Sequence, residues 1–184
     1  YEPPLQYHYL RRPYRLVPLS ATALPRATLL DQAGNVLPAN TDPALATASV
    51  YEIRIRPGIR YAPHPAFART DTGELRYHQI DPGALDRDFT ERGSRELTAD
   101  DYVYQIKRLA SPRVQSPIRG LLQAHIAGFA DLTAALAAAG NGWLDLRQFE
   151  LAGVQAIDRY TLRIRLTDVY PQFMYWLAMP FFAP

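Results

Sequence analysis

Strict alternation of apolar and charged side chains over residues 49–56 constrains this 184-residue chain more than any other feature. The apolar positions are Tyr51, Ile53 and Ile55, and a charged residue follows each of them. Successive side chains of a β-strand point to opposite faces, whereas a helix repeats every 3.6 residues. The pattern therefore predicts a strand with one face in a core and the other in water.

Residues 153–166 repeat this alternation, with Leu162, Ile164 and Leu166 at every second position. Asp158 and Arg159 lie between two apolar runs and predict a tight turn. Strands that a tight turn joins run antiparallel. We therefore expect a hairpin here and a small, mostly antiparallel sheet.

Helical periodicity begins after Thr98. Thr98 and Asp101 have the spacing of a capping box, with Asp in place of Glu, and Ser111-Pro112 predicts the end of the helix. The apolar side chains then fall on one face: Tyr102, Val103, Ile106, Leu109 and Ala110. Helices and an antiparallel sheet together predict the α+β class.

Two more helical segments are predicted. Residues 117–139 carry apolar residues at helical spacing, with a break at Gly128. The last segment starts at 170–171, with proline at the first helical position and an apolar face that includes Phe173 and Trp176. Both are expected to pack on the sheet.

Three stretches lack such periodicity. Residues 1–30 contain too much proline for a long helix and predict short extended pieces. Residues 31–47 predict a loop with a turn at Gly34. Residues 62–96 predict a long surface excursion, and loops of that length are often functional.

Composition excludes several classes of protein. The net charge of +2 gives no reason to expect a nucleic-acid partner. The absence of cysteine excludes disulfides, thiolate zinc sites and cysteine nucleophiles. His64 and His78 both lie in the 62–96 excursion, but isolated loop histidines seldom form a metal site, so no metal is expected.

A few acidic residues are the only candidates for catalysis that the sequence suggests. Asp100 and Asp101 are adjacent at a helix start, where they cannot both aim at one bond but do favour the helix dipole. A hydrolase that used these acids or Asp158 with a loop histidine is the less favoured alternative. The chain has neither a Gly-x-Ser-x-Gly elbow nor a phosphate-binding glycine loop, so we expect no enzyme and no cofactor.

The order of several motifs resembles one protein family. Arg-Pro-Gly-Ile-Arg-Tyr at 56–61 precedes Leu-Thr-Ala-Asp-Asp-Tyr at 97–102. Gly-Val-Gln-Ala-Ile-Asp-Arg-Tyr-Thr-Leu at 153–162 and Tyr-Pro-Gln-Phe at 170–173 follow in turn. In this order the motifs resemble the family-5 extracellular solute-binding proteins, which are the oligopeptide, dipeptide and nickel receptors of ATP-binding-cassette (ABC) importers.

The resemblance implies a fold, a location and partners. Residues 1–184 would form a single domain, the extra domain of the N-terminal lobe, excised from a larger receptor of the periplasmic binding protein type II-like architecture. The receptor would be periplasmic, take up a peptide or another small solute, and pass it to an ABC transporter permease. It would bind its ligand without catalysis.

In peptide-binding members this domain offers two side chains to the ligand. The matching positions here are Ile118, after the Ser-Pro that follows the first helix, and Met179, before the proline of the last segment. The resemblance therefore implies that Ile118 and Met179 are ligand-binding residues. A protein-interaction module that acts through residues 62–96 is the other alternative.

The aromatic residues at the C-terminal end predict an exposed apolar surface. Phe181 and Phe182 follow Pro180, which stops a helix, so they are expected to be partly exposed. Such a monomeric chain could then self-associate weakly through its exposed C-terminal end.

Overall fold

The computed structural model describes residues 2–77, 83–140 and 142–184. Contacts within the chain divide it into two compact units. The main unit comprises Tyr1–Arg56 and Thr98–Pro184, and the small unit comprises Pro57–Leu97.

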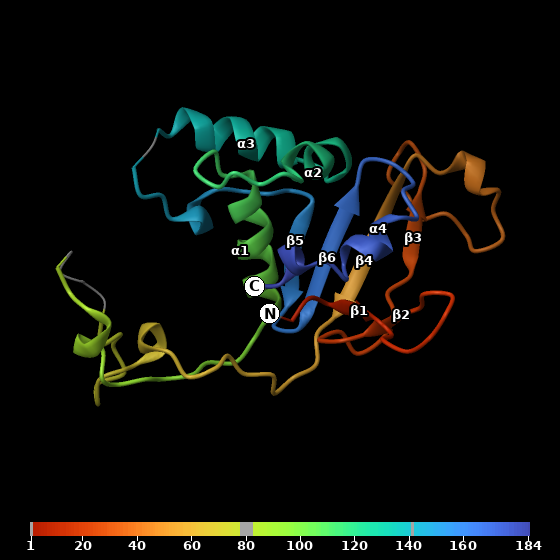
Figure 1. Cartoon of the computed structure of the whole chain (residues 1–184). Coiled ribbons are helices and arrows are strands. Elements are labelled where there is room, and N and C mark those ends of the chain that lie inside the picture. Colours follow the sequence, from red (N-terminus) through yellow and green to blue (C-terminus); the bar gives the residue numbers. More distant parts are fainter. Residues whose placement is uncertain (1, 78–82, 141) are drawn as a thin grey trace. The chain divides into compact units, whose positions relative to one another are not determined.

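A four-stranded antiparallel sheet forms the centre of the main unit (Figure 1). Its strand order is β3 (Ala27–Leu30), β4 (Ala48–Arg54), β6 (Thr161–Leu166) and β5 (Val154–Asp158). Tyr51 pairs with Ile164 and Ile53 with Leu162, and all four side chains are buried. Both predicted strand regions and the hairpin are confirmed. The register of the strands follows from the buried face, since a shift by one residue would turn these apolar side chains to the solvent.

The proline-rich start forms the predicted short extended pieces. β1 (Leu5–Tyr7) and β2 (Leu16–Pro18) make a separate two-stranded antiparallel sheet. The buried Ser20 hydroxyl lies 2.5 Å from the Tyr102 hydroxyl, which also donates to the carbonyl oxygen of Glu2 at 2.9 Å. These bonds fasten the N-terminal segment to the first helix.

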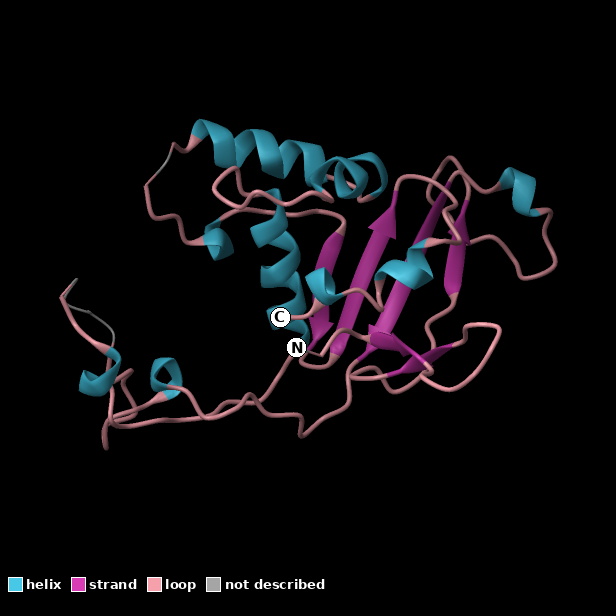
Figure 2. Ribbon diagram, viewed as in Figure 1, coloured by secondary structure: helices cyan, strands magenta, loops and turns pink. Residues whose placement is uncertain are grey.

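Helices accompany the sheet (Figure 2). α1 (Ala99–Ala110) has the predicted capping box and packs against β5 and β6. α2 (Arg119–His125) and α3 (Phe129–Ala138) meet at Gly128, whose φ of 74° favours glycine, so the predicted break is confirmed. No helix of the described ranges is long and apolar enough to cross a membrane.

The C-terminal segment corrects two predictions. α4 (Phe173–Trp176) is four residues long and begins later than Pro171. A 3-10 turn then spans Pro180–Phe182 and turns Phe182 back onto Phe173, with ring centroids 5.9 Å apart. Phe182 is fully buried and Phe181 is half-buried. The expected exposure is therefore wrong for Phe182 and confirmed for Phe181, which is partly exposed. Weak self-association through this end stays a prediction.

The small unit contains the predicted excursion 62–96. Its described residues form two 3-10 turns, at Pro65–Phe67 and Asp86–Asp88, and isolated β-bridges in place of regular strands. The guanidinium of Arg95 lies 4.6 Å from the ring centre of Tyr61 and 5.3 Å from that of Phe67. This unit thus has a small aromatic cluster of its own.

Candidate functional site

Ile118 is half-buried and occupies the N-cap position of α2. The next residue, Arg119, holds this segment in place. Its guanidinium donates to the carbonyl oxygens of Ser111 at 2.7 Å and Leu109 at 3.4 Å, and to that of Val114. Carbonyl groups at a helix end have no partner within the helix, so these bonds stabilise the end of α1 and fix the loop that leads to Ile118.

Met179 is half-buried too and occupies the N-cap position of the 3-10 turn Pro180–Phe182. Its backbone N–H donates to the carbonyl oxygen of Trp176 at 2.8 Å. The Gln105 side-chain amide donates to the carbonyl oxygen of Phe181 at 3.1 Å. This bond fastens the turn to α1.

α1 therefore anchors both segments that carry the expected ligand-binding residues. Gln105 holds the Met179 segment, and Leu109, one helical turn later, holds the Ile118 segment. Gln105 acts through its side-chain amide, whereas Leu109 acts through its backbone carbonyl oxygen. Ligand contact by Ile118 and Met179 stays a prediction.

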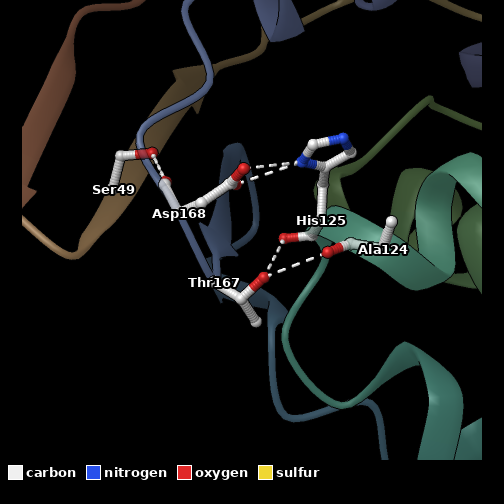
Figure 3. A network of polar contacts seen from close by, with 5 residues as sticks. All are labelled: Ser49, Ala124, His125, Thr167 and Asp168. Carbon is white, nitrogen blue, oxygen red and sulfur yellow. Dashed lines mark hydrogen bonds and ion pairs between the residues drawn. The ribbon is translucent and has the colours of Figure 1, made fainter.

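A polar network joins α2 to the end of β6 (Figure 3). Nδ1 of His125 lies 2.9 and 3.1 Å from the two carboxylate oxygens of Asp168. The Thr167 backbone N–H donates to the carbonyl oxygen of His125 at 2.8 Å, and its hydroxyl donates to that of Ala124 at 3.2 Å. Thr167 thereby satisfies carbonyl groups at the end of α2.

Aromatic rings enclose the imidazole of this network. The Tyr170 ring stacks on His125 at a centroid distance of 4.1 Å, and Trp176 meets His125 edge-on at 5.5 Å. The exposed fraction of the His125 side chain is 17%, and that of Asp168 is 44%. No local motif links residues so far apart in the chain, so the sequence patterns did not indicate this cluster.

The network lacks the geometry of a catalytic triad. The Ser49 hydroxyl is buried and donates to the backbone carbonyl oxygen of Asp168 at 2.9 Å, not to the imidazole of His125. A serine nucleophile needs a hydrogen bond to its base. The arrangement instead holds β4, β6 and α2 together.

Tyr51 lies beside this network on β4. Burial is the main cause that raises the pKa of its hydroxyl, and the negative charge of Asp168 adds to the effect. Its ring packs 5.1 Å from that of Phe173. Tyr51 thus connects the sheet to α4 through its ring, and its hydroxyl stays protonated at neutral pH.

Two of the acids considered for catalysis, Asp101 and Asp158, have structural partners. The Asp101 carboxylate accepts from the Thr98 backbone N–H at 2.8 Å as part of the capping box. Asp158 accepts from the Tyr160 backbone N–H at 2.8 Å, and this bond, followed by one from the Thr161 side chain, lowers its pKa. A general acid at neutral pH needs a raised pKa, so Asp158 is poorly suited to that role.

Of the two histidines considered for a metal site, the structure describes only His64. Nδ1 of His64 accepts from the Ala66 backbone N–H at 3.1 Å, which caps a 3-10 turn. His78 lies outside the described residues. Within the part of the chain that the structure describes, no group of three or more metal-binding side chains occurs.

The interaction-module alternative requires an exposed apolar surface on residues 62–96. Leu75 and Leu85 are the large hydrophobic side chains there that are exposed among the described positions. Both are only about half exposed, at 43% and 50%. The interaction-module alternative stays a prediction.

Comparison with known proteins agrees with the predicted resemblance. No protein-family model matches the chain. The curated periplasmic oligopeptide-binding protein OppA of Salmonella typhimurium strain LT2 is 36% identical over 89 residues, which are 48% of this chain and 14% of that protein. This chain therefore spans only a small part of that relative.

Solved structures match almost the whole chain. OppA of Burkholderia pseudomallei matches 100% of this chain with 24% of its own length, at a TM-score of 0.53 and 16% identity. The murein tripeptide binding protein MppA of Escherichia coli matches 99% of this chain with 24% of its own length, at a TM-score of 0.52 and 18% identity. The α+β chain thus has the fold of a quarter of an OppA-type protein, and its predicted resemblance to the family-5 extracellular solute-binding proteins is confirmed.

Proposed function

We propose that this chain is part of a periplasmic receptor that binds a peptide and delivers it to the permease of an ABC importer. The observation that carries this proposal is the structural match over the whole chain to two peptide-binding proteins of that fold. The curated relative is itself a periplasmic oligopeptide-binding protein. In the complete receptor, hinge closure of two lobes would enclose the ligand.

Within that receptor, this chain would be the extra domain of the N-terminal lobe and would form one edge of the ligand cleft. Ile118 and Met179 would contribute apolar contacts there. Two features support this role. Both residues are half-buried, and α1 anchors both of their backbone segments. Such anchoring limits the conformational entropy lost when a ligand is bound.

The proposed role is binding without catalysis. Asp101 is engaged in a helix cap, and the pKa of Asp158 is lowered, not raised. The His125–Asp168 pair has no hydrogen bond to the Ser49 hydroxyl. A purified full-length receptor should therefore leave a bound peptide intact, which mass spectrometry before and after long incubation would measure.

Native mass spectrometry of the full-length receptor, purified from its host, tests the ligand class. The mass of the co-purified molecule should be that of a short peptide. Calorimetry with this peptide then tests the two ligand residues. Ile118→Ala and Met179→Ala should each weaken binding by roughly tenfold, because each removes apolar contact area.

A matched control uses Val36→Ala and Leu45→Ala, which shorten exposed apolar side chains elsewhere in the main unit. These should leave the affinity unchanged. A peptide that co-purifies but binds the Ile118 and Met179 variants normally would leave the receptor function intact and reject the two ligand residues. A non-peptide ligand would reject the proposed substrate class.

The 184-residue chain alone should not bind short peptides with useful affinity, since it corresponds to a quarter of the solved receptors. Calorimetry with di- to pentapeptides tests this expectation. Micromolar binding to the isolated chain would show that it contains a complete ligand site.

A further inference from the structure

The hairpin that joins β1 to β2 exposes apolar side chains at its tip. Tyr9 is 87% exposed and Leu10 is 80% exposed, which places them among the most exposed large side chains of the described residues. They are adjacent in the sequence, and the connecting loop extends outward from the sheet of the main unit (Figure 1). Two such neighbours on a loop tip are costly to leave in water.

The same hairpin carries a concentrated positive charge. Arg11, Arg12 and Arg15 are all exposed, and no Asp or Glu occurs between Glu2 and Asp31. Across the described ranges, none of these three guanidinium groups forms an ion pair. The charge is therefore available to an anionic partner.

Ring contacts hold the hairpin in a defined shape. The Arg12 guanidinium lies 4.3 Å from the ring centre of Tyr14, and the Tyr14 ring meets Tyr7 edge-on at 6.1 Å. Tyr7 in turn stacks on Tyr175 of α4 at 6.4 Å. The His8 backbone N–H donates to the carbonyl oxygen of Arg15 at 2.8 Å. Ordering the hairpin on binding would thus cost little entropy.

We propose that residues 7–15 form an interfacial anchor for a bilayer surface that bears anionic headgroups. The arginines would lie among the headgroups, where each basic side chain contributes attraction to anionic lipid. Tyr9 and Leu10 would enter the boundary between headgroups and acyl chains, a region that favours aromatic and apolar side chains.

The geometry favours a bilayer over an acidic protein segment. A protein partner that binds through aromatic and arginine side chains normally surrounds them in packed pockets at the centre of an interface. Here two of the most exposed apolar side chains of the described residues are at the end of a narrow two-stranded hairpin, with arginines directly after them. A bilayer can accept such a protruding tip between its anionic headgroups and its acyl chains, and no complementary pocket is needed.

Co-sedimentation of the 184-residue chain with lipid vesicles tests the anchor. Vesicles with about one-third phosphatidylglycerol in phosphatidylcholine should bind the chain at low ionic strength, whereas pure phosphatidylcholine should bind it far less. Raising the salt to about 0.5 M should remove most of the binding, because added ions screen the charges.

Paired variants assign the binding to the hairpin. Arg11→Gln with Arg12→Gln should lower the partition coefficient on anionic vesicles by roughly tenfold to thirtyfold. Arg108→Gln with Arg165→Gln removes the same charge from exposed positions elsewhere and should have little effect. Tyr9→Ser with Leu10→Ser should weaken binding severalfold, while Val36→Ser with Leu45→Ser should not.

Four results would overturn the anchor. They are no binding to anionic vesicles at low salt, equal binding to neutral vesicles, equal losses for the two arginine pairs, and unchanged binding of the Tyr9 and Leu10 variant. Binding to polyglutamate without binding to vesicles would instead indicate an acidic protein partner. Because the assay uses this chain and no peptide, its outcome is independent of the proposed receptor function.

Discussion

The Asp168 carboxylate lies 2.9 Å from Nδ1 of His125, a residue 43 positions earlier in the chain. This contact joins the last residue of α2 to the segment that directly follows β6 (Figure 3). The imidazole is mostly shielded by Tyr170 and Trp176, so the contact is less screened by water than a surface pair. It fastens the helical part of the main unit to its sheet.

A double-mutant cycle should show this coupling. Asp168→Ala and His125→Ala, alone and together, are expected to give a coupling free energy of about 0.5–1 kcal/mol in urea denaturation. The matched cycle uses Glu52 and Arg163, an ion pair whose side chains are 54% and 43% exposed. It should give the smaller value, since water screens it more. A larger coupling for Glu52 and Arg163 would contradict the shielded role of His125.

Thr98→Ala should lower the free energy of unfolding by about 1 kcal/mol, because Thr98 is the N-cap of α1 and part of its capping box. Chemical denaturation measures the change. Thr47→Ala, at an exposed position away from any helix start, should change stability by less than about 0.5 kcal/mol. Equal effects of both substitutions would show that the cap contributes nothing specific.

Two glycines should respond in opposite directions to alanine. A Cβ at Gly153 would lie 2.3 Å from the carbonyl oxygen of Ala127, a backbone atom, so Gly153→Ala should destabilise by about 2 kcal/mol or more. Gly120 lies within α2 with open space around it, and Gly120→Ala should stabilise by up to about 1 kcal/mol. Thermal unfolding of both variants checks the pair. An unchanged melting temperature of Gly153→Ala would mean that the junction between α2 and α3 can move away from the start of β5.

Tyr51 predicts a loss of stability at alkaline pH. Its pKa in the folded chain is raised, chiefly by burial, from the ordinary value of 10.0, so the folded state keeps this proton when the unfolded chain releases it. The resulting stabilisation is complete below pH 10 and is lost as the pH rises through the folded pKa. Unfolding free energies measured above pH 10 should therefore fall more steeply for the wild type than for Tyr51→Phe. Tyr9→Phe, at an exposed ring, should retain the wild-type slope.

Local patterns predicted the regular elements well. Alternation identified β4 and the hairpin of β5 and β6, and the Thr98 capping box identified the start of α1. Gly128 marked the break between α2 and α3. These succeed because periodicity, caps and left-handed backbone positions depend on residues that are neighbours in the chain.

The candidate ligand residues rest on resemblance to a family and not on a pattern in the residues themselves. Ile118 and Met179 have no chemical signature of their own. The structure adds how their segments are held, by Arg119 and Gln105 through bonds to or from α1. These bonds span up to 76 positions of the chain, so no local motif could reveal them.

The residue pattern was thus enough to locate β4, β5, β6, the start of α1 and the break between α2 and α3, and to indicate the α+β class and the resemblance to solute-binding proteins. Tertiary structure alone decided that Phe182 packs on Phe173, that His125 meets Asp168, and that Tyr7 stacks on Tyr175. Periodicity says which face of an element is apolar, but not which distant side chain will cover it. The topology of the folded chain decides this, because the hydrophobic effect is non-directional and stabilises contact between any apolar side chains that the topology brings together.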